Sequence, residues 1–192
     1  MKKALMIASI LVVAVISTAC INNIAVQELN NKASEFMQKG DYESAMNRLQ
    51  ASLDLDSTIY ETHYNLGVAA INAKKYEIAI KALEDGIKLK PDYPDFYYSL
   101  GVAQIGMAED IVEEADVDEE ASADTESGEV KVSSEIKEED KAKAVELRKS
   151  AIENLNKYLE MTPDSKEMEN VQEMIKQSEE FVNGDIEAEV KE

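Results

Sequence analysis

Side chains that commonly do chemistry are scarce in this chain. It holds one cysteine, Cys20, and one histidine, His63. A single cysteine excludes an internal disulfide framework and a thiolate zinc cluster. Because no second histidine is available, we interpret His63 as a packing residue rather than a ligand. The seven glycines form neither a phosphate-binding loop nor a nucleophile elbow. We therefore expect no catalytic site, no metal and no cofactor.

Carboxylates are the one abundant reactive group, with 40 acidic residues against 20 basic ones and a net charge of -20. They are densest from Glu109 to Asp140, which holds 15 acidic residues and two lysines. Without an aromatic residue, this segment cannot bury enough apolar surface to offset its ordering entropy. We expect a disordered tip near residues 116–134, with no carboxylate pair held at catalytic distance. The overall charge also argues against a nucleic-acid partner, because phosphates would be repelled.

A calcium site is the alternative to a disordered acidic tip in this segment. Asp116, Asp118 and Glu120 alternate as in an EF-hand loop. However, Ala121 occupies the place of the required glycine and Ser127 that of the bidentate glutamate. We interpret the segment as a solvated loop, and docking against a basic partner stays open.

Cys20 ends a stretch with the pattern of an export signal. Lys2 and Lys3 precede an apolar run over residues 4–16, and the small residues 17–19 lead to the cysteine. This pattern resembles the lipobox of bacterial lipoproteins, although Ser17 stands where that family usually has leucine. The resemblance implies a signal peptide over residues 1–19 and a lipid on Cys20.

Two other interpretations of the N-terminus remain open. Cleavage after Ala19 would release the chain without a lipid, and an uncleaved anchor would use about 18 residues, 4–21, near the short limit for a membrane span. All three place the remainder outside the cytoplasm. We expect an extracytoplasmic chain of the bacterial cell envelope, lipid-anchored to a membrane.

Internal repetition is the strongest signal for the fold. Two apolar stripes at helical spacing, separated by a polar turn, recur with a period of about 34 residues. The equivalent pairs include Tyr42 and Tyr76, Ala45 and Ala79, Leu49 and Leu83, and the small residues Ala33, Gly67 and Gly101. Thr58 and Glu61 form the pattern of a capping box at the start of the second unit.

These residues resemble the tetratricopeptide repeat, a helix–turn–helix unit of about 34 residues. The family's small residue matches Ala33, Gly67 and Gly101, and its later alanine matches Ala45, Ala79 and Ala151. Lys32 and Tyr158 depart from the pattern. The resemblance implies an all-α solenoid of about three repeats, with a C-terminal capping helix and a long acidic insertion in the third repeat. An unrelated helical bundle is the alternative.

The spacing gives the expected organisation of the chain. After the signal peptide 1–19, we expect the first two repeats and the first helix of the third over 20–105. The acidic insertion follows over 106–143, then the second helix of the third repeat over 144–165, a capping helix over 166–183 and an acidic tail over 184–192.

The resemblance also implies a concave groove lined by the first helix of each repeat. The matching residues are Asn30, Ser34 and Met37, then Tyr64, Asn65, Val68, Ile71 and Asn72, then Tyr98, Val102 and Ile105. We expect Tyr64 and Tyr98 to anchor a peptide or partner helix. The alternative is that these residues pack internally, within the superhelix or under the terminal helix.

One binding mode of the family does not fit. Members that grip a chaperone's C-terminal carboxylate use lysine, arginine and asparagine at five places, which here hold Asn30, Ser34, Asn65, Asp95 and Ser99. Only Asn65 agrees, and Asp95 has the opposite charge. We therefore expect a scaffold for an unidentified envelope protein without a carboxylate clamp. A structural or accessory role, through self-association or the acidic loop, is the second hypothesis, so a homo-oligomer is possible.

Overall fold

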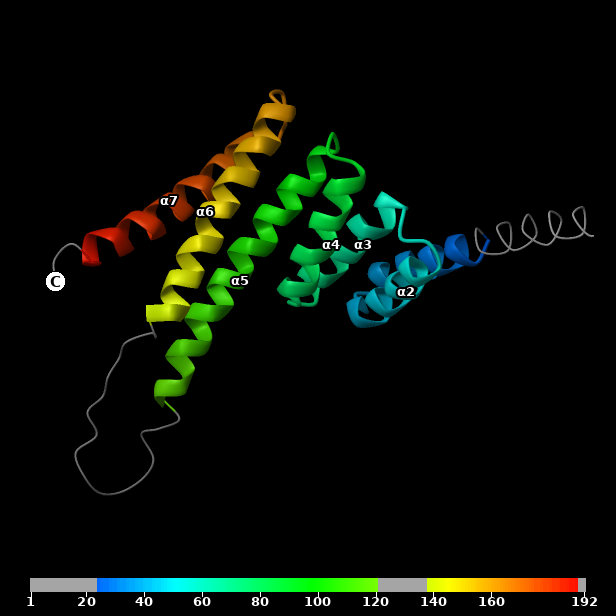
Figure 1. Ribbon diagram of the computed structural model, residues 1–192, viewed down its shortest axis with the longest axis horizontal. Helices are drawn as coiled ribbons and strands as arrows, with labels where there is room; N and C mark the ends of the chain where they lie inside the picture. The colour runs from blue at the N-terminus through cyan, green and yellow to red at the C-terminus, as the bar shows by residue number, and fades with distance from the viewer. Residues whose placement is uncertain (1–23, 121–137, 190–192) are drawn as a thin grey trace, which may run out of the picture.

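The computed structural model describes residues 24–120 and 138–189, with side chains over 24–113 and 138–184. Each element in these ranges is an α-helix. The first helix covers residues 24–38. It is followed by α2 (Tyr42–Leu55), α3 (Tyr60–Asn72), α4 (Tyr76–Leu89), α5 (Pro94–Glu120), α6 (Glu138–Met161) and α7 (Met168–Glu189). Figure 1 shows them stacked one after another in chain order, as in a solenoid.

Helix pairs are the building unit of this stack. The helix over 24–38 pairs with α2, α3 with α4, and α5 with α6, which also contacts α7. In the first two pairs the turn needs a left-handed residue. Gly40 supplies it at φ 75°, and Lys74 does so at the equivalent place of the next repeat, at φ 54°. Glycine adopts this conformation freely, whereas a residue with a Cβ atom does so at a cost of about 1–2 kcal/mol.

A small residue lets the two helices of each pair approach closely. A Cβ atom on Gly67 would lie 2.5 Å from Cγ of Leu83, and one on Gly101 would lie 2.7 Å from Cγ of Leu155. Gly67 and Leu83 belong to helices joined by a short turn, whereas the whole acidic segment lies between Gly101 and Leu155. The same helix contact therefore recurs in the third pair despite a much longer connection between its partners.

The core runs along the stack as three clusters of buried apolar side chains. Leu49 and Leu66 centre the first cluster, Leu83 and Phe96 the second, and Leu155 and Val171 the third. Phe96 is fully buried and would meet a Cβ atom on Gly86 at 2.2 Å, so α4 also packs closely on α5. Each cluster joins side chains of successive helices, as expected for a solenoid in which every unit covers its neighbour.

The hairpin of α5 and α6 is longer than the other two pairs, with 27 and 24 residues in its helices. Both helices run well into the segment 106–143. Arg148 of α6 fastens the hairpin to α7: its guanidinium lies 3.0 Å from the Glu109 carboxylate, 3.4 Å from the Ser178 hydroxyl and 5.1 Å from the centre of the Phe181 ring. The side chains of the expected disordered tip, near residues 116–134, and of the EF-hand-like residues lie outside those described. The first residues of that tip, 116–120, are helical as the end of α5, so the expectation of disorder was wrong for them.

Two helix starts differ from the sequence expectation. The N-cap of α3 is Ile59, whose aliphatic side chain makes no hydrogen bond, whereas the Thr58 hydroxyl donates to the Asp56 carboxylate at 2.6 Å. The capping box of Thr58 and Glu61 was therefore wrong. Helix α7 begins at Met168 and continues to Glu189, beyond the expected limits of 166–183. The turn before α7 is held by Ser165, whose hydroxyl accepts a hydrogen bond from the Glu167 backbone amide at 3.1 Å.

The N-terminal residues that matter for anchoring, including Cys20, lie outside the described residues. Within the described residues, we find no helix with the length and apolar character needed to cross a membrane.

Candidate functional site

The candidate site is the first-helix face, which we define as the expected groove residues on the helix over 24–38, on α3 and on α5. These helices are neighbours in the stack. The Thr62 hydroxyl of α3 donates to the Asn30 side chain at 3.1 Å, and α3 also contacts α5. Ser34 and Asn72 are exposed. The remaining members are half-buried: Asn30, Met37, Tyr64, Asn65, Val68, Ile71, Tyr98, Val102 and Ile105.

Asn30 is held by neighbouring helices. Its amide nitrogen donates to the Ser52 hydroxyl at 2.8 Å and to the Val26 carbonyl at 3.0 Å. Its oxygen accepts from Thr62, which is fully buried. Buried hydroxyls need such partners, because an unmade hydrogen bond costs about 1–3 kcal/mol. Asn30 thus links the first helix to α2 and α3.

Tyr64 stands in an aromatic group at the α3–α5 contact. Its ring meets the rings of Tyr93 and Phe96 edge-on, with centroids 5.5 and 5.6 Å apart. Its hydroxyl is hydrogen-bonded to Ser99, and the Tyr93 hydroxyl is hydrogen-bonded to the Asp95 carboxylate. Edge-to-face aromatic pairs stabilise by about 0.5–1.5 kcal/mol beyond their buried area. The Tyr64 ring is therefore fixed in place by packing.

Tyr98 connects the face to the end of the solenoid. Its ring lies 5.3 Å from that of Tyr158 on α6. The Tyr158 hydroxyl in turn donates to the Glu167 carboxylate at 3.2 Å. Glu167 is exposed, whereas Tyr158 is buried. Tyr64, Tyr93, Tyr98, Tyr158, Asp95 and Glu167 form one group, which we call the tyrosine–carboxylate cluster.

Burial and negative charge act together on the hydroxyls of this cluster. Burial raises the pKa of Tyr64, and the Asp95 and Glu167 carboxylates add to that increase, against the hydrogen bond with Ser99. Burial also raises the pKa of Tyr98, followed by the effect of Glu167. Burial and the hydrogen bond to Asp95 raise the pKa of Tyr93 to about 12. All these phenols are therefore neutral hydrogen-bond donors at physiological pH.

The expected groove residues also make internal contacts. Met37 packs against the first core cluster, Tyr64 and Ile71 against the second, and Tyr98 and Ile105 against the third. Val68 and Val102 are half-buried at equivalent places on α3 and α5. Accessible aliphatic surface beside fixed aromatic rings suits the burial of an apolar segment.

Sequence reasoning missed four members of the cluster as site residues, among them Asp95, which it noted only as a departure from the carboxylate clamp. Tyr93 lies in the turn between α4 and α5, outside the repeat positions that line the groove, and Glu167 precedes α7. The signal for Tyr158 was its own departure from the family pattern, where a small residue is usual. The larger ring reaches Tyr98 and Glu167 and so extends the cluster across α6.

His63 is a packing residue of α3, as its sequence context indicated. It is buried, with its Nε2 atom 3.0 Å from the Ser57 carbonyl. Its Nδ1 atom is buried without a hydrogen-bond partner. Among the side chains described, we find no group of three or more histidine, cysteine or carboxylate residues placed to hold a metal.

Comparison with known proteins bears on this face. Residues 33–70 and 73–107 match the sequence pattern of the TPR repeat, TPR being the tetratricopeptide repeat. No curated protein matches the chain in sequence.

Several solved structures share the fold at low sequence identity. The first TPR of Spaghetti (RPAP3), bound to the HSP90 peptide SRMEEVD, has a TM-score of 0.56 at 15% identity, over 81% of this chain and 90% of that one. The second TPR domain of human RPAP3, in complex with the HSP70 peptide SGPTIEEVD, gives 0.56 at 14%, over 82% and 98%. The Arabidopsis OM64 TPR domain gives 0.56 at 13%, over 82% and 96%. Residues 33–70 and 73–107 are therefore similar to tetratricopeptide repeats in sequence, and the described residues share the all-helical solenoid fold of tetratricopeptide-repeat domains.

Proposed function

We propose that this chain is a membrane-anchored, extracytoplasmic interaction scaffold that binds a peptide or helix of an envelope protein on its first-helix face. The observation that carries the proposal is that Val68 and Val102 are both half-buried at equivalent repeat positions. Each lies one helical turn after the tyrosine of the same helix, Tyr64 or Tyr98. The tether would be a lipid on Cys20, four residues before the first helix begins. The repeat domain would then lie close to the membrane surface.

Two structural relatives support binding on this type of fold. The Spaghetti and human RPAP3 domains are described in complex with chaperone peptides, SRMEEVD and SGPTIEEVD. This chain differs at the places that would hold such a terminal carboxylate, where it has Asp95 and Ser99. We therefore propose the same general use of the fold with a different ligand.

Internal packing favours a second candidate function. Tyr98 and Ile105 contact the cluster formed by α6 and α7, and Tyr64 contacts the cluster around Phe96. In this alternative, the chain is a structural or accessory lipoprotein that acts through self-association or its acidic loop. The first-helix face would then bind no ligand.

The test is a pair of matched double variants. Val68→Asp with Val102→Asp places two charges on the first-helix face. Ile78→Asp with Leu89→Asp places the same two charges on α4, at side chains that are each 42% exposed. After cross-linking in cells, we expect the first pair to lose the partner recovered with wild type and the second pair to retain it. Equal recovery with both pairs would contradict the proposal, provided that circular dichroism shows both to be folded.

A further inference from the structure

The tyrosine–carboxylate cluster places two carboxylates, Asp95 and Glu167, beside the tyrosines of the first-helix face. Asp95 is half-buried in the first turn of α5, and its carboxylate accepts a hydrogen bond from Tyr93. Glu167 reaches the same region from the segment before α7, where it accepts a hydrogen bond from the buried Tyr158. Both carboxylates act on the Tyr64 hydroxyl, whereas Glu167 is the one of the two that acts on the Tyr98 hydroxyl.

The phenol groups complete an environment that suits a cation. Tyr64, Tyr93 and Tyr98 are half-buried, so each ring keeps part of its surface accessible while packing holds its orientation. A cation over an aromatic ring gains about 0.5–1 kcal/mol at exposed sites and more where water is excluded. A nearby carboxylate adds a charge-assisted hydrogen bond. Both interactions are available within this single cluster.

We infer that the tyrosine–carboxylate cluster receives an arginine side chain from the partner segment, an assignment that rests on the proposed function of the first-helix face. A guanidinium is planar, stacks on aromatic rings and can donate to two carboxylates at once. Those properties match the cluster, in which Asp95 contacts the tyrosine that packs against Tyr64, and Glu167 contacts the tyrosine that packs against Tyr98. The valines of the same face would contact the apolar neighbours of that arginine.

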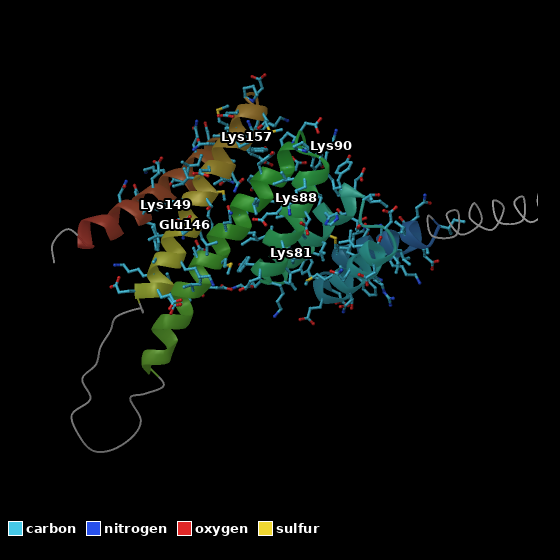
Figure 2. All side chains as sticks on the ribbon, in the orientation of Figure 1. Lys81, Lys88, Lys90, Glu146, Lys149 and Lys157 are labelled. Carbon is cyan, nitrogen blue, oxygen red and sulfur yellow. The ribbon has the colours of Figure 1, made fainter. Side chains whose placement is uncertain are left out.

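Three lysines of α4 and α6 pair with acidic residues of their own helices. Lys81 and Lys88 of α4 both pair with Asp85 of their own helix, at 3.0 and 2.8 Å, and Lys157 of α6 pairs with Glu160 at 3.1 Å. Figure 2 shows these lysines and Lys149 on α4 and α6, each of which is the second helix of its pair. None of the three paired lysines pairs with Asp95 or Glu167, and Lys90, in the turn before α5, pairs with Asp92 at 2.9 Å.

The experiment uses the full chain and a set of labelled peptides. The peptides share one leucine-rich sequence with an amidated C-terminus and differ at a single place, which holds arginine, lysine, glutamine or glutamate. Fluorescence anisotropy measures their affinity at low and high salt. We expect arginine to bind most tightly, lysine next, and glutamate weakest, with about a tenfold difference between arginine and glutamine.

Matched variants separate the cluster from the general acidity of the chain. Asp95→Asn with Glu167→Gln removes two charges and keeps the shape and the hydrogen-bond acceptors. Glu84→Gln with Glu153→Gln removes two charges from exposed places on α4 and α6. We expect the first pair to weaken the arginine peptide about tenfold and the second pair to leave its affinity unchanged. Ring signals of Tyr64 and Tyr98, followed by NMR, should shift with the arginine peptide in wild type only.

Asp95→Lys with Glu167→Lys supplies the reverse test, since it should favour the glutamate peptide over the arginine peptide. Equal affinity for all four peptides, or equal losses in the two matched pairs, would overturn the inference. If Val68→Asp with Val102→Asp still abolishes partner recovery in that case, the proposed function stands without the arginine. If those valine changes also have no effect, both proposals fail.

Discussion

At the scale of single residues, the central feature is the group of tyrosines whose ionisation the fold opposes. Tyr93 is the clearest case, because burial and the hydrogen bond to Asp95 raise its pKa from 10.0 to about 12. A phenol with a raised pKa favours folding while it stays neutral. Its contribution to the free energy of unfolding is fully present below pH 10 and is lost as the pH rises through about 12.

This shift predicts the order in which tyrosines ionise in alkaline solution. Spectrophotometric titration of the folded chain should show a late tyrosinate step near pH 12 that disappears in Tyr93→Phe. Tyr42→Phe is the control, because that residue lies on α2 away from the cluster. A late step that persists in Tyr93→Phe, or its absence from the wild-type chain while the fold is intact, would contradict the contacts described for this ring.

Sequence reasoning found individual residues where a backbone rule applied. It placed a polar turn within each unit, which the structure has at Gly40 and Lys74, and it identified Gly67 and Gly101 as small residues that recur with the repeat. It failed at Thr58, since Asp56 competes for that hydroxyl from two places earlier in the chain. The tyrosine–carboxylate cluster was not predicted as a unit because its members come from α3, α5, α6 and two turns, and only the fold brings them together.

At the scale of elements, α7 is held to the solenoid by both apolar and polar contacts. Val171 and Ile175 enter the third core cluster, and Arg148 reaches α7 from α6 through Ser178 and Phe181. The Arg148 side chain is only 10% exposed, whereas that of its partner Glu109 is 55% exposed. Most of what this arginine contributes should therefore come from packing and ring contact, with the ion pair as a smaller part.

The unequal exposure of the pair predicts unequal effects of its two substitutions. Arg148→Ala should lower the free energy of unfolding by about 2–3 kcal/mol, because the stem packing, the ring contact and the hydrogen bonds are lost. Glu109→Gln should cost less than about 1 kcal/mol. Urea denaturation measures both values. Hydrogen exchange should show that Arg148→Ala loosens α7 while α3 and α4 stay protected; equal costs for both variants would contradict this account.

The apolar periodicity of the sequence predicted which helices form, but it predicted where they begin and end less accurately. The internal repetition predicted the pairing of α3 with α4 from short-range patterns. The lengths of α5 and α6 depend on how far the two helices pack against each other, and the local sequence pattern does not predict this. In the same way, α7 continues to Glu189 although charged residues dominate its last turns.

At the scale of the whole molecule, the ion-paired lysines of the second helices α4 and α6 lie on different elements from the residues of the first-helix face. Lysines and carboxylates alternate on α4 and α6 and pair within single turns, as for Lys81 with Asp85. The tyrosines and valines of the first-helix face, together with Asp95, lie on the first helices α3 and α5. The acidity of -20 is concentrated between Glu109 and Asp140, largely outside the described side chains. Specific binding on the first-helix face should therefore depend on the cluster and resist a change in the charge of α4 or α6.

Site-specific photo-cross-linking in cells tests the central claim most directly. A photoreactive amino acid is placed at Ser34 or Asn72, which are exposed on the first-helix face, and at Lys81 or Glu153, which are exposed on α4 and α6. The account predicts a discrete protein adduct from Ser34 and Asn72 that Val68→Asp with Val102→Asp removes, and none from Lys81 or Glu153. Adducts that form only from Lys81 and Glu153, or that persist after the valine changes, would contradict it.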